Sequence, residues 1–318
     1  MPRISVVIPA YRVAPYIEQC VRSVLAQTYP DFECIVVDDG SPDETGAIVS
    51  AIQDPRLRLI RQENGGVASA RNTGWRNASG EAVMILDGDD FLTPSALARL
   101  IVSLDAHPEA VLVFGTILRT NEAGELESNQ KALALHTYAS GEILEEVVAS
   151  RRTFFNGGQM LMRRSAIAEV GGYDPALPFN EDWEFFCRLA ALGPCIYIGP
   201  QEEVMRHRIR ANSAAPTLSA NWQNYVPAMK KVRENRMMEQ RFGAGRWRAL
   251  IAEAEAAHVF ESGRQLFIRR EFGRARRLMV KGILLRPSKR HLALFAAAQL
   301  TQILGRPVVG RLRFTDAV

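Results

Sequence analysis

The first 115 residues alternate short runs of apolar, often β-branched residues with segments of helical periodicity. Apolar runs cover 4–9, 32–37 and 58–61, and helical segments at 16–27 and 45–52 separate them. Strands that are apolar on both faces, joined by helices of this size, are typical of a parallel sheet that is covered on both sides. We therefore expect an α/β fold with a doubly wound, mostly parallel sheet and helices on both sides.

This alternation ends near residue 115, and a different pattern follows further along the chain. Before that point we predict two more helices, at 67–77 and 94–105, and two more strands, at 82–86 and 110–114. From about Ser219 onward the strand signals disappear, and Ala, Glu, Arg and Leu recur with helical spacing. The sequence thus predicts an α/β domain over residues 1–215 and a helical region over 216–318.

Charge is divided unevenly between these two regions. The whole chain carries 39 Lys and Arg against 35 Asp and Glu, but residues 262–318 alone carry 13 against 2. Such a local excess of basic side chains favours an acidic partner, which leaves an anionic membrane surface, a polyanionic acceptor or a nucleic acid. Nucleic acid is the least favoured of these, because no aromatic residues are regularly interleaved with the basic ones.

Neither a membrane-spanning helix nor a secretion signal is expected. The longest apolar stretch near the C-terminus, 292–304, has 13 residues and contains two glutamines, against roughly 20 apolar residues for a helix that crosses a bilayer. That stretch would either lie in a membrane interface or pack against the rest of the protein. The first strand begins at Ile4 without the segments of a signal peptide. We expect a location in the cytoplasm or on the inner face of the membrane.

Polar and aromatic residues follow the first two predicted strands directly. Pro9, Ala10 and Tyr11 end the first strand, and Asp38 and Asp39 end the second. Ligands of such sheets bind beyond the carboxyl ends of the strands, and an aromatic ring with carboxylates suits a nucleobase. The glycine patterns of dinucleotide and P-loop sites are absent. The competing interpretation is that the acids cap the next helix.

A denser acidic cluster follows the fourth predicted strand. Asp87, Asp89 and Asp90 place three carboxylates within four residues, which repel one another unless a cation or a hydrogen-bond donor compensates. Hard oxygen ligands suit Mg²⁺ or Mn²⁺, usually with phosphate oxygens completing the coordination shell. The simpler interpretation is a tight turn around Gly88, but the position after an apolar strand favours a metal.

Two further motifs lie in the second half of the chain. Asp182 and Trp183 open an amphipathic helix, so the acid either stabilises the helix N-terminus or serves as a general base. His207 stands between two arginines in a predicted loop, where it could meet a metal or a diphosphate.

Taken together, these motifs resemble family 2 of the inverting glycosyltransferases, a family with the GT-A fold. The matching segments are 5–11 (SVVIPAY), 36–41 (VVDDGS), 65–66 (GG), 70–72 (ARN), 86–90 (LDGDD) and 181–182 (ED). They occur in the family's order and approximate spacing across about residues 3–213. The resemblance implies a catalytic domain whose nucleotide-sugar half covers about 1–115 and whose acceptor half covers about 116–215, followed by the basic helical region 216–318.

The resemblance also implies roles for individual residues. The residues implied to bind the nucleotide are Pro9, Ala10, Tyr11, Asp39, Arg71, Asp87 and Gly88. Within this group Asp39 would face a ring nitrogen of the base, and Asp87 would serve the ribose. The residues implied to bind the metal are Asp87, Asp89 and His207, and the implied catalytic base is Asp182. Residues 219–318 match no acceptor motif of the family.

The implied function is metal-dependent transfer of a sugar, with inversion, from a nucleoside-diphosphate sugar to an acceptor hydroxyl in polysaccharide or glycan synthesis. The implied cofactor is Mn²⁺ or Mg²⁺, the foremost donor is a UDP-sugar, and the acceptor is a glycan or is lipid-linked. One alternative is a non-catalytic protein that binds sugar nucleotides or glycans, which the full set of acids disfavours. Another is a sugar nucleotidyltransferase, which the lack of glycine after the first strand disfavours.

Overall fold

The computed structural model describes residues 1–126, 138–150, 157–210, 215–287, 291–293, 295–296 and 298–299. The chain divides into two units. The described residues of the first unit lie within 1–143, 155–176 and 188–211, and those of the second within 144–154, 177–187 and 212–318. The second unit therefore begins close to the predicted boundary at 215 but also takes in two earlier segments, which the division at 215 does not include.

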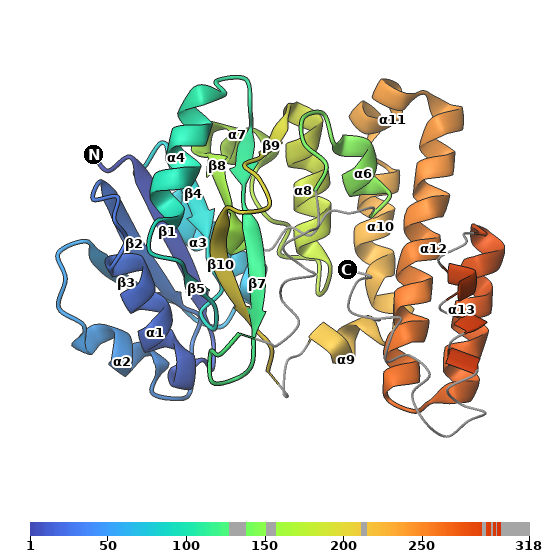
Figure 1. Ribbon diagram of the computed structural model, residues 1–318, viewed down its shortest axis with the longest axis horizontal. Helices are drawn as coiled ribbons and strands as arrows, with labels where there is room; N and C mark the ends of the chain where they lie inside the picture. Colours follow the sequence, from blue (N-terminus) through green and yellow to red (C-terminus); the bar gives the residue numbers. More distant parts are fainter. Residues whose placement is uncertain are drawn as a thin grey trace. The chain divides into compact units, whose positions relative to one another are not determined.

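A seven-stranded sheet forms the centre of the first unit (Figure 1). Its strands are β1 (Ile4–Ala10), β2 (Phe32–Asp38), β3 (Leu57–Arg61), β4 (Ala82–Ile85), β6 (Leu112–Phe114), β8 (Met160–Arg163) and β9 (Cys195–Tyr197). They follow the order β3-β2-β1-β4-β8-β6-β9. The first four are mutually parallel and β8 runs antiparallel to its neighbours β4 and β6. The predicted mostly parallel sheet is confirmed.

A smaller, three-stranded sheet lies in the same unit. Its strands are β5 (Phe91–Leu92), β7 (Thr116–Thr120) and β10 (Glu203–Arg208). The central strand β10 is antiparallel to β5 and parallel to β7. Because β5 begins at the residue after Asp90, this sheet continues directly from the acidic cluster.

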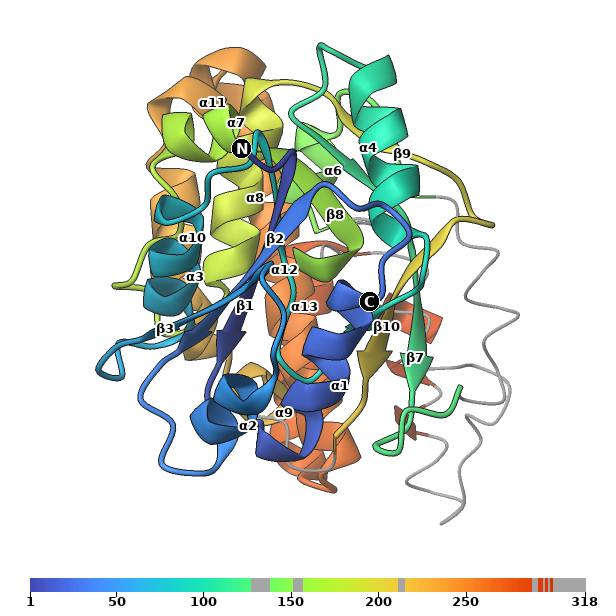
Figure 2. The same cartoon turned by 90° about the vertical axis from the view of Figure 1, so that its left-hand side faces the viewer.

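Helices cover both faces of the large sheet (Figure 2). Those of the first unit include α1 (Ala14–Leu25), α2 (Thr45–Ala51), α3 (Val67–Arg76), α4 (Ala96–Ala106) and α7 (Arg164–Val170). Ile8 of β1 shares one buried core with Ile17 of α1 and Leu97 of α4. Side chains alternate along a strand, so Val7 faces the other side. There α3 packs so closely that a Cβ atom at Gly74 would clash with Val7.

Helices make up the described part of the second unit, as the sequence predicts for the C-terminal region. They are α6 (Leu144–Val148), the first seven residues of α8 (Glu181–Leu192), α9 (Ala215–Ser219), the 3₁₀ helix η2 (Trp222–Tyr225), α10 (Val226–Arg233), α11 (Arg236–Phe242), α12 (Ala244–Ile268) and α13 (Phe272–Leu285). Phe260 of α12 and Met279 of α13 share a buried core between these two neighbouring helices.

Side chains of α12 explain why α6 and the start of α8 group with the C-terminal helices. The ring of Trp183 in α8 lies edge-on to His258 of α12, with 5.0 Å between the ring centroids. The indole N–H of Trp183 also donates to the carbonyl of Val147 in α6, at 2.8 Å. The predicted boundary rested on local signals, namely the end of the strand pattern and a cluster of Asn, Ser and Pro. Contacts between aromatic side chains of distant segments leave no such signal.

The described residues contain no helix that is long and apolar enough to cross a bilayer. The apolar stretch 292–304 lies in large part outside the described residues. All four cysteines are free and buried.

His258 is a buried histidine that has to remain neutral in the folded chain. Its ring stacks on Tyr225 with 4.4 Å between the centroids, and among the described residues its Nε2 atom has no hydrogen-bond partner. Burial lowers the pKa of His258 from 6.5 to about 3. Below pH 6.5 the unfolded chain therefore takes up a proton that the folded chain does not.

The free energy of unfolding should consequently fall as the pH drops below 6.5, by up to about 1.4 kcal/mol per pH unit. In the His258→Phe variant, which keeps a ring between Tyr225 and Trp183, this contribution should be absent. Urea unfolding at pH 7 and pH 5 measures it, and we expect the wild type to lose about 2 kcal/mol more than the variant. An equal pH dependence in both proteins would show that His258 is protonated in the folded state.

Candidate active site

The carboxyl ends of β1, β2 and β4 lie at one edge of the large sheet. Hydrogen bonds continue the ladder beyond the strands, because Asp39 N donates to Ala10 O at 2.9 Å and Leu86 N donates to Val7 O at 2.8 Å. The residues that follow these strands are therefore held in register with one another. The motifs at 9–11, 38–41 and 87–90 extend from this edge.

Asp39 is almost fully buried and fixes the loop that precedes α3. Its carboxylate accepts hydrogen bonds from Gln62 Nε2 at 2.7 Å and from the backbone N–H groups of Gly65 and Gly66, both at 2.9 Å. Gly66 has a φ angle of 85°, which favours glycine. The glycine pair and the aspartate, far apart in the sequence, thus form one structural unit.

The neighbouring Asp38 has a different role. Its Oδ1 atom accepts a hydrogen bond from Ser41 N at 3.0 Å and so closes a turn. The residue that precedes α2 is Glu44, whose side chain does not cap the helix, and the carboxylate that accepts the N–H group of Thr45 at the start of α2 belongs to Asp43. The alternative interpretation of Asp38 and Asp39 as caps of the next helix is therefore wrong.

Two kinds of surface are available next to these acids. Tyr11 is exposed after β1, whereas Pro9 and Ala10 are buried in the strand. On the β3 side of β2 lies a cavity of about 370 Å³. It is lined by Asp38, Gly40, Ser41, Asp43, Gly46, Ala47, Arg61 and Gln62. Because Gln62 also binds Asp39, the cavity and the buried carboxylate share a side chain.

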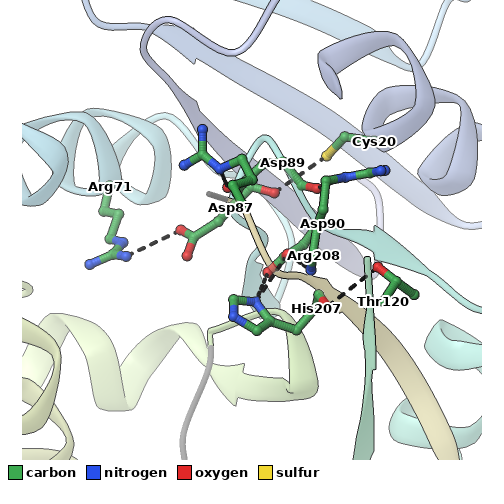
Figure 3. Close-up of polar contacts among 9 residues, drawn as sticks. Cys20, Arg71, Asp87, Asp89, Asp90, Thr120, His207 and Arg208 are labelled. Atoms are coloured by element: carbon green, nitrogen blue, oxygen red, sulfur yellow. Dashed lines mark hydrogen bonds and ion pairs between the residues drawn. The ribbon is translucent and has the colours of Figure 1, made fainter. Parts of the chain in front are cut away.

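Each of the acids after β4 is paired with a different cation (Figure 3). Arg71 of α3 places Nη2 3.1 Å from Asp87 Oδ1, and the guanidinium of Arg71 lies 5.1 Å from the ring centroid of Tyr173. Arg210, two residues after β10, places Nε 2.6 Å from Asp89 Oδ2. Asp87 and Asp89 are thus paired with arginines from two segments of the chain, one before and one after the acidic cluster.

Asp90 is buried and binds β10. Its carboxylate lies 3.1 Å from His207 Nδ1, and its Oδ1 atom accepts a hydrogen bond from Arg208 N at 2.8 Å (Figure 3). Arg208 in turn donates through Nε to the carbonyl of Asp89 at 2.9 Å. His207 therefore belongs to a strand, and the predicted loop at 206–208 is wrong, because pairing with β5 and β7 orders the segment.

The crowding of charge shifts two pKa values in this cluster. Burial, together with the negative charges of Asp90 and Asp87, raises the pKa of Asp89 from 3.8 to about 6, although Arg210 opposes the shift. Burial alone would lower the pKa of His207, but the charge and hydrogen bond of Asp90 outweigh it and raise that pKa. The arginines therefore compensate the acids only in part.

The chemistry of this donor set fits a divalent cation. Carboxylate oxygens are ligands of Mn²⁺ and Mg²⁺ sites, and an imidazole nitrogen favours a transition metal such as Mn²⁺ over Mg²⁺. Among the described residues, however, no three His, Cys, Asp or Glu side chains form a ready-made metal site. In this structure Asp87, Asp89 and His207 each bind an amino-acid partner, so the three-ligand set stays a prediction.

Asp182 belongs to the second unit, at the start of α8. It is only partly buried, whereas the other two acids in the first turn of α8, Glu181 and Glu184, are 8% and 5% exposed. Asp182 Oδ1 accepts the backbone N–H of Trp183 at 2.7 Å, and the Trp183 ring is fixed by Val147 and His258. Asp182 is thus the most exposed of the three acids in this turn.

Sequence reasoning missed several residues of this site. Arg210 and Arg208 hold the acids after β4, Gln62 holds Asp39, and Tyr173 packs on Arg71. One signal was present, because three neighbouring acids require cations and the segment 206–210 contains three arginines. Which arginine meets which acid depends on the pairing of β10 with β5.

Sequence comparison gives relatives among bacterial glycosyltransferases. The chain is 45% identical over 102 residues to the "uncharacterized glycosyltransferase EpsJ" of Bacillus subtilis (strain 168), covering 31% of this chain and 30% of EpsJ. It is 32% identical over 227 residues to the succinoglycan biosynthesis protein ExoO of Rhizobium meliloti (strain 1021), covering 69% of this chain and 64% of ExoO. The matched part therefore spans less than a third of EpsJ and just under two thirds of ExoO.

Comparison with solved structures finds glycosyltransferase structures whose fold is similar to that of this chain. A fragment of S. aureus TarS in complex with UDP-GlcNAc matches with a TM-score of 0.64 and 16% identity, over 96% of this chain and 93% of that one. The mannosyltransferase PcManGT from Pyrobaculum calidifontis, in complex with GDP-Man and Mn²⁺, matches with a TM-score of 0.59 and 21% identity, over 96% and 88% of the two chains. The expected GT-A fold is confirmed.

The model of the family described as "Glycosyl transferase family 2" matches residues 5–171. These residues include β1 to β4, the carboxylates after β4 and the glycine pair that binds Asp39. The match covers more than half of the chain, and the motifs it spans are those that the structure gathers at one edge of the sheet. The chain belongs to glycosyl transferase family 2.

Proposed function

We propose that this chain transfers a sugar from a nucleoside-diphosphate sugar to a hydroxyl group of a glycan or lipid-linked acceptor, with inversion at the anomeric carbon. The observation that carries the proposal is the gathering of Asp39, Arg71 and the carboxylates 87–90 beyond the ends of parallel strands. Support for the donor class comes from the nucleotide sugars bound by TarS and PcManGT. We expect UDP as the nucleotide, and the name of ExoO supports a polysaccharide product.

The nucleobase would bind at the ends of β1 and β2. Two backbone N–H groups and Gln62 already orient the Asp39 carboxylate, so little further ordering is required when the base arrives. The exposed ring of Tyr11 would stack on the base, next to the backbone of Pro9 and Ala10.

The rest of the nucleotide would extend toward the acids after β4. Arg71, held against Tyr173 and Asp87, would lie beside the nucleotide. Asp87 would accept hydrogen bonds from the ribose hydroxyls. Gly88 would allow close approach, because a Cβ atom there would already meet Pro9 O at 3.2 Å.

Asp89 would hold Mn²⁺ or Mg²⁺, with Asp87 and His207 nearby. When bound, such an ion stabilises the charge that grows on the departing diphosphate, a contribution of several kcal/mol. Asp90 would position the imidazole for this role, because its contacts with His207 and Arg208 N fix the strand that carries it.

Asp182 would be the general base. It would accept the proton of the acceptor hydroxyl while that oxygen forms a bond to the anomeric carbon and the bond from this carbon to the diphosphate breaks. A single displacement from the face opposite the nucleotide inverts the configuration and needs no covalent intermediate. The partial exposure of Asp182, beside two buried acids, supports this assignment over a purely structural one.

The basic residues of 262–318 suggest where the chain would bind its acceptor. Thirteen Lys and Arg against two acids favour attachment to an anionic membrane surface, at which a lipid-linked acceptor would be available. Each basic side chain near acidic headgroups contributes about 1 kcal/mol to such attachment.

Removal of divalent cations should abolish transfer. After exhaustive dialysis against EDTA, release of nucleoside diphosphate from the donor should stop, and added Mn²⁺ should restore it. Asp89→Asn should remain inactive when Mn²⁺ is added, whereas Asp31→Asn, a change of an exposed acid, should be restored like the wild type. An unchanged rate after dialysis would remove the metal from the reaction, and release of pyrophosphate would indicate a nucleotidyltransferase.

Asp182→Asn should lower kcat by about 10² or more, as expected for the loss of a general base. The donor-induced rise in the thermal unfolding midpoint should stay near that of the wild type, because the donor site lies on other residues. Initial rates at saturating donor and a thermal-shift titration measure the two quantities. A kcat equal to that of the wild type would exclude Asp182 as the base.

Asp39→Asn should weaken donor binding by about tenfold or more, because it alters a buried, charged hydrogen-bond acceptor. The kcat at saturating donor should change little, since a hydrogen bond to the base is made in the ground and transition states alike. Thermal-shift titration with UDP-sugars measures the effect, with Asp38→Asn as the matched control. If Asp38→Asn weakens binding more, the base lies in the cavity beside Asp38 and the assignment to Asp39 is wrong.

A further inference from the structure

A second cavity, of about 200 Å³, lies wholly within the helical unit. It is lined by Ala220, Asn221, Trp222, Leu266, Arg274, Arg277 and Leu278, which come from η2 and the turn before it, from α12 and from α13. Ala220 and Leu266 are buried, whereas the two arginines are exposed. The cavity therefore has an apolar base and a basic opening, and no residue of the donor site takes part in it.

The basic residues of α13 are concentrated on the face that borders this cavity. The helix carries four basic residues and no acidic one. Arg274, Arg277 and Lys281 are spaced three and four residues apart, which places them on one side of the helix. The fourth basic residue, Arg276, is exposed and does not line the cavity.

Compensation of these charges within the protein is slight. Among the described residues Arg277 makes no ion pair, and the pair of Arg274 with Glu271, at 2.6 Å, has side chains that are 62% and 38% exposed. Lys281 places its Nζ atom 3.8 Å from the ring centroid of Trp222. A positive potential therefore remains at the opening of the cavity.

Exposed apolar side chains continue the same face. Leu284 and Leu285 lie three and four residues after Lys281, and they are 77% and 38% exposed. Exposed leucines beside a row of basic side chains are typical of helices that bind at a membrane interface. This combination favours a lipid over a soluble anion as the source of the negative charge.

We propose that this cavity binds the phosphate group of an anionic lipid headgroup, held between Arg274 and Arg277 at the opening beside Trp222. Guanidinium groups bind phosphate oxygens through paired N–H donors, and two arginines line this cavity. Leu284 and Leu285 would enter the interface on the same side of α13. The inference rests on the proposed attachment to an anionic surface and is independent of the donor site.

The test compares two neighbouring arginines in the full chain. Arg277→Ala and Arg276→Ala remove the same charge from exposed positions of one helix, but only Arg277 lines the cavity. Sedimentation with vesicles of phosphatidylcholine and phosphatidylglycerol should give a partition coefficient that is about fivefold lower for Arg277→Ala. The coefficient of Arg276→Ala should stay within about twofold of the wild type.

Two further measurements separate the outcomes. Inorganic phosphate, added at constant ionic strength, should raise the thermal unfolding midpoint of the wild type only slightly. If phosphate stabilises the wild type and not Arg277→Ala, while both variants bind vesicles equally, the ligand is a soluble phosphate and the lipid assignment is overturned. Equal vesicle binding without any phosphate effect would overturn the site itself. Donor-induced stabilisation, measured on the same samples, should be unaffected, so failure here is distinct from failure of the proposed catalysis.

Discussion

The site depends on how negative charge is compensated after β4. Asp87, Asp89 and Asp90 would repel one another if left alone. Arg71 of α3 holds Asp87, whereas residues in and just after β10 hold Asp89 and Asp90. The bond from Arg208 N to Asp90 joins residues 118 positions apart. It ties β10 to the point where β5 begins, so the acidic cluster and the small sheet stabilise one another. The same interaction brings His207 to the carboxylates.

The central fold could be predicted from the sequence because its determinants are local. The largely apolar runs 4–9 and 32–37 differ from the observed strands β1 and β2 by only one residue. The antiparallel strand β8 and the small sheet could not be predicted, since both depend on pairing between distant segments. In β10 the sequence EVMRHR has too few apolar residues to resemble a strand, and its neighbours β5 and β7 supply the order.

The candidate site, like the fold, could be predicted from the sequence only in part. Strand ends identify Asp39 and Asp87, because parallel strands bring their carboxyl ends to one edge. They do not identify the partners of these acids, since Gly65, Gly66 and Gln62 reach Asp39 through the turn before α3. Neither do they reveal that α8 begins in the helical unit with Asp182 and continues into the first unit at Arg188. That division follows from the contacts of Trp183 with α6 and α12, which have no local signature.

The balance of charge around the acids also bears on the order of binding. Three carboxylates stand beside the guanidinium groups of Arg71, Arg208 and Arg210, so part of their negative charge is already compensated before any ligand arrives. A divalent cation alone would therefore find a reduced negative charge there. A nucleoside diphosphate bound as proposed would add negative charge next to Asp89, where burial and the charges of Asp90 and Asp87 already raise the pKa to about 6. We therefore expect cation and donor to bind together, because each supplies the charge that the other requires.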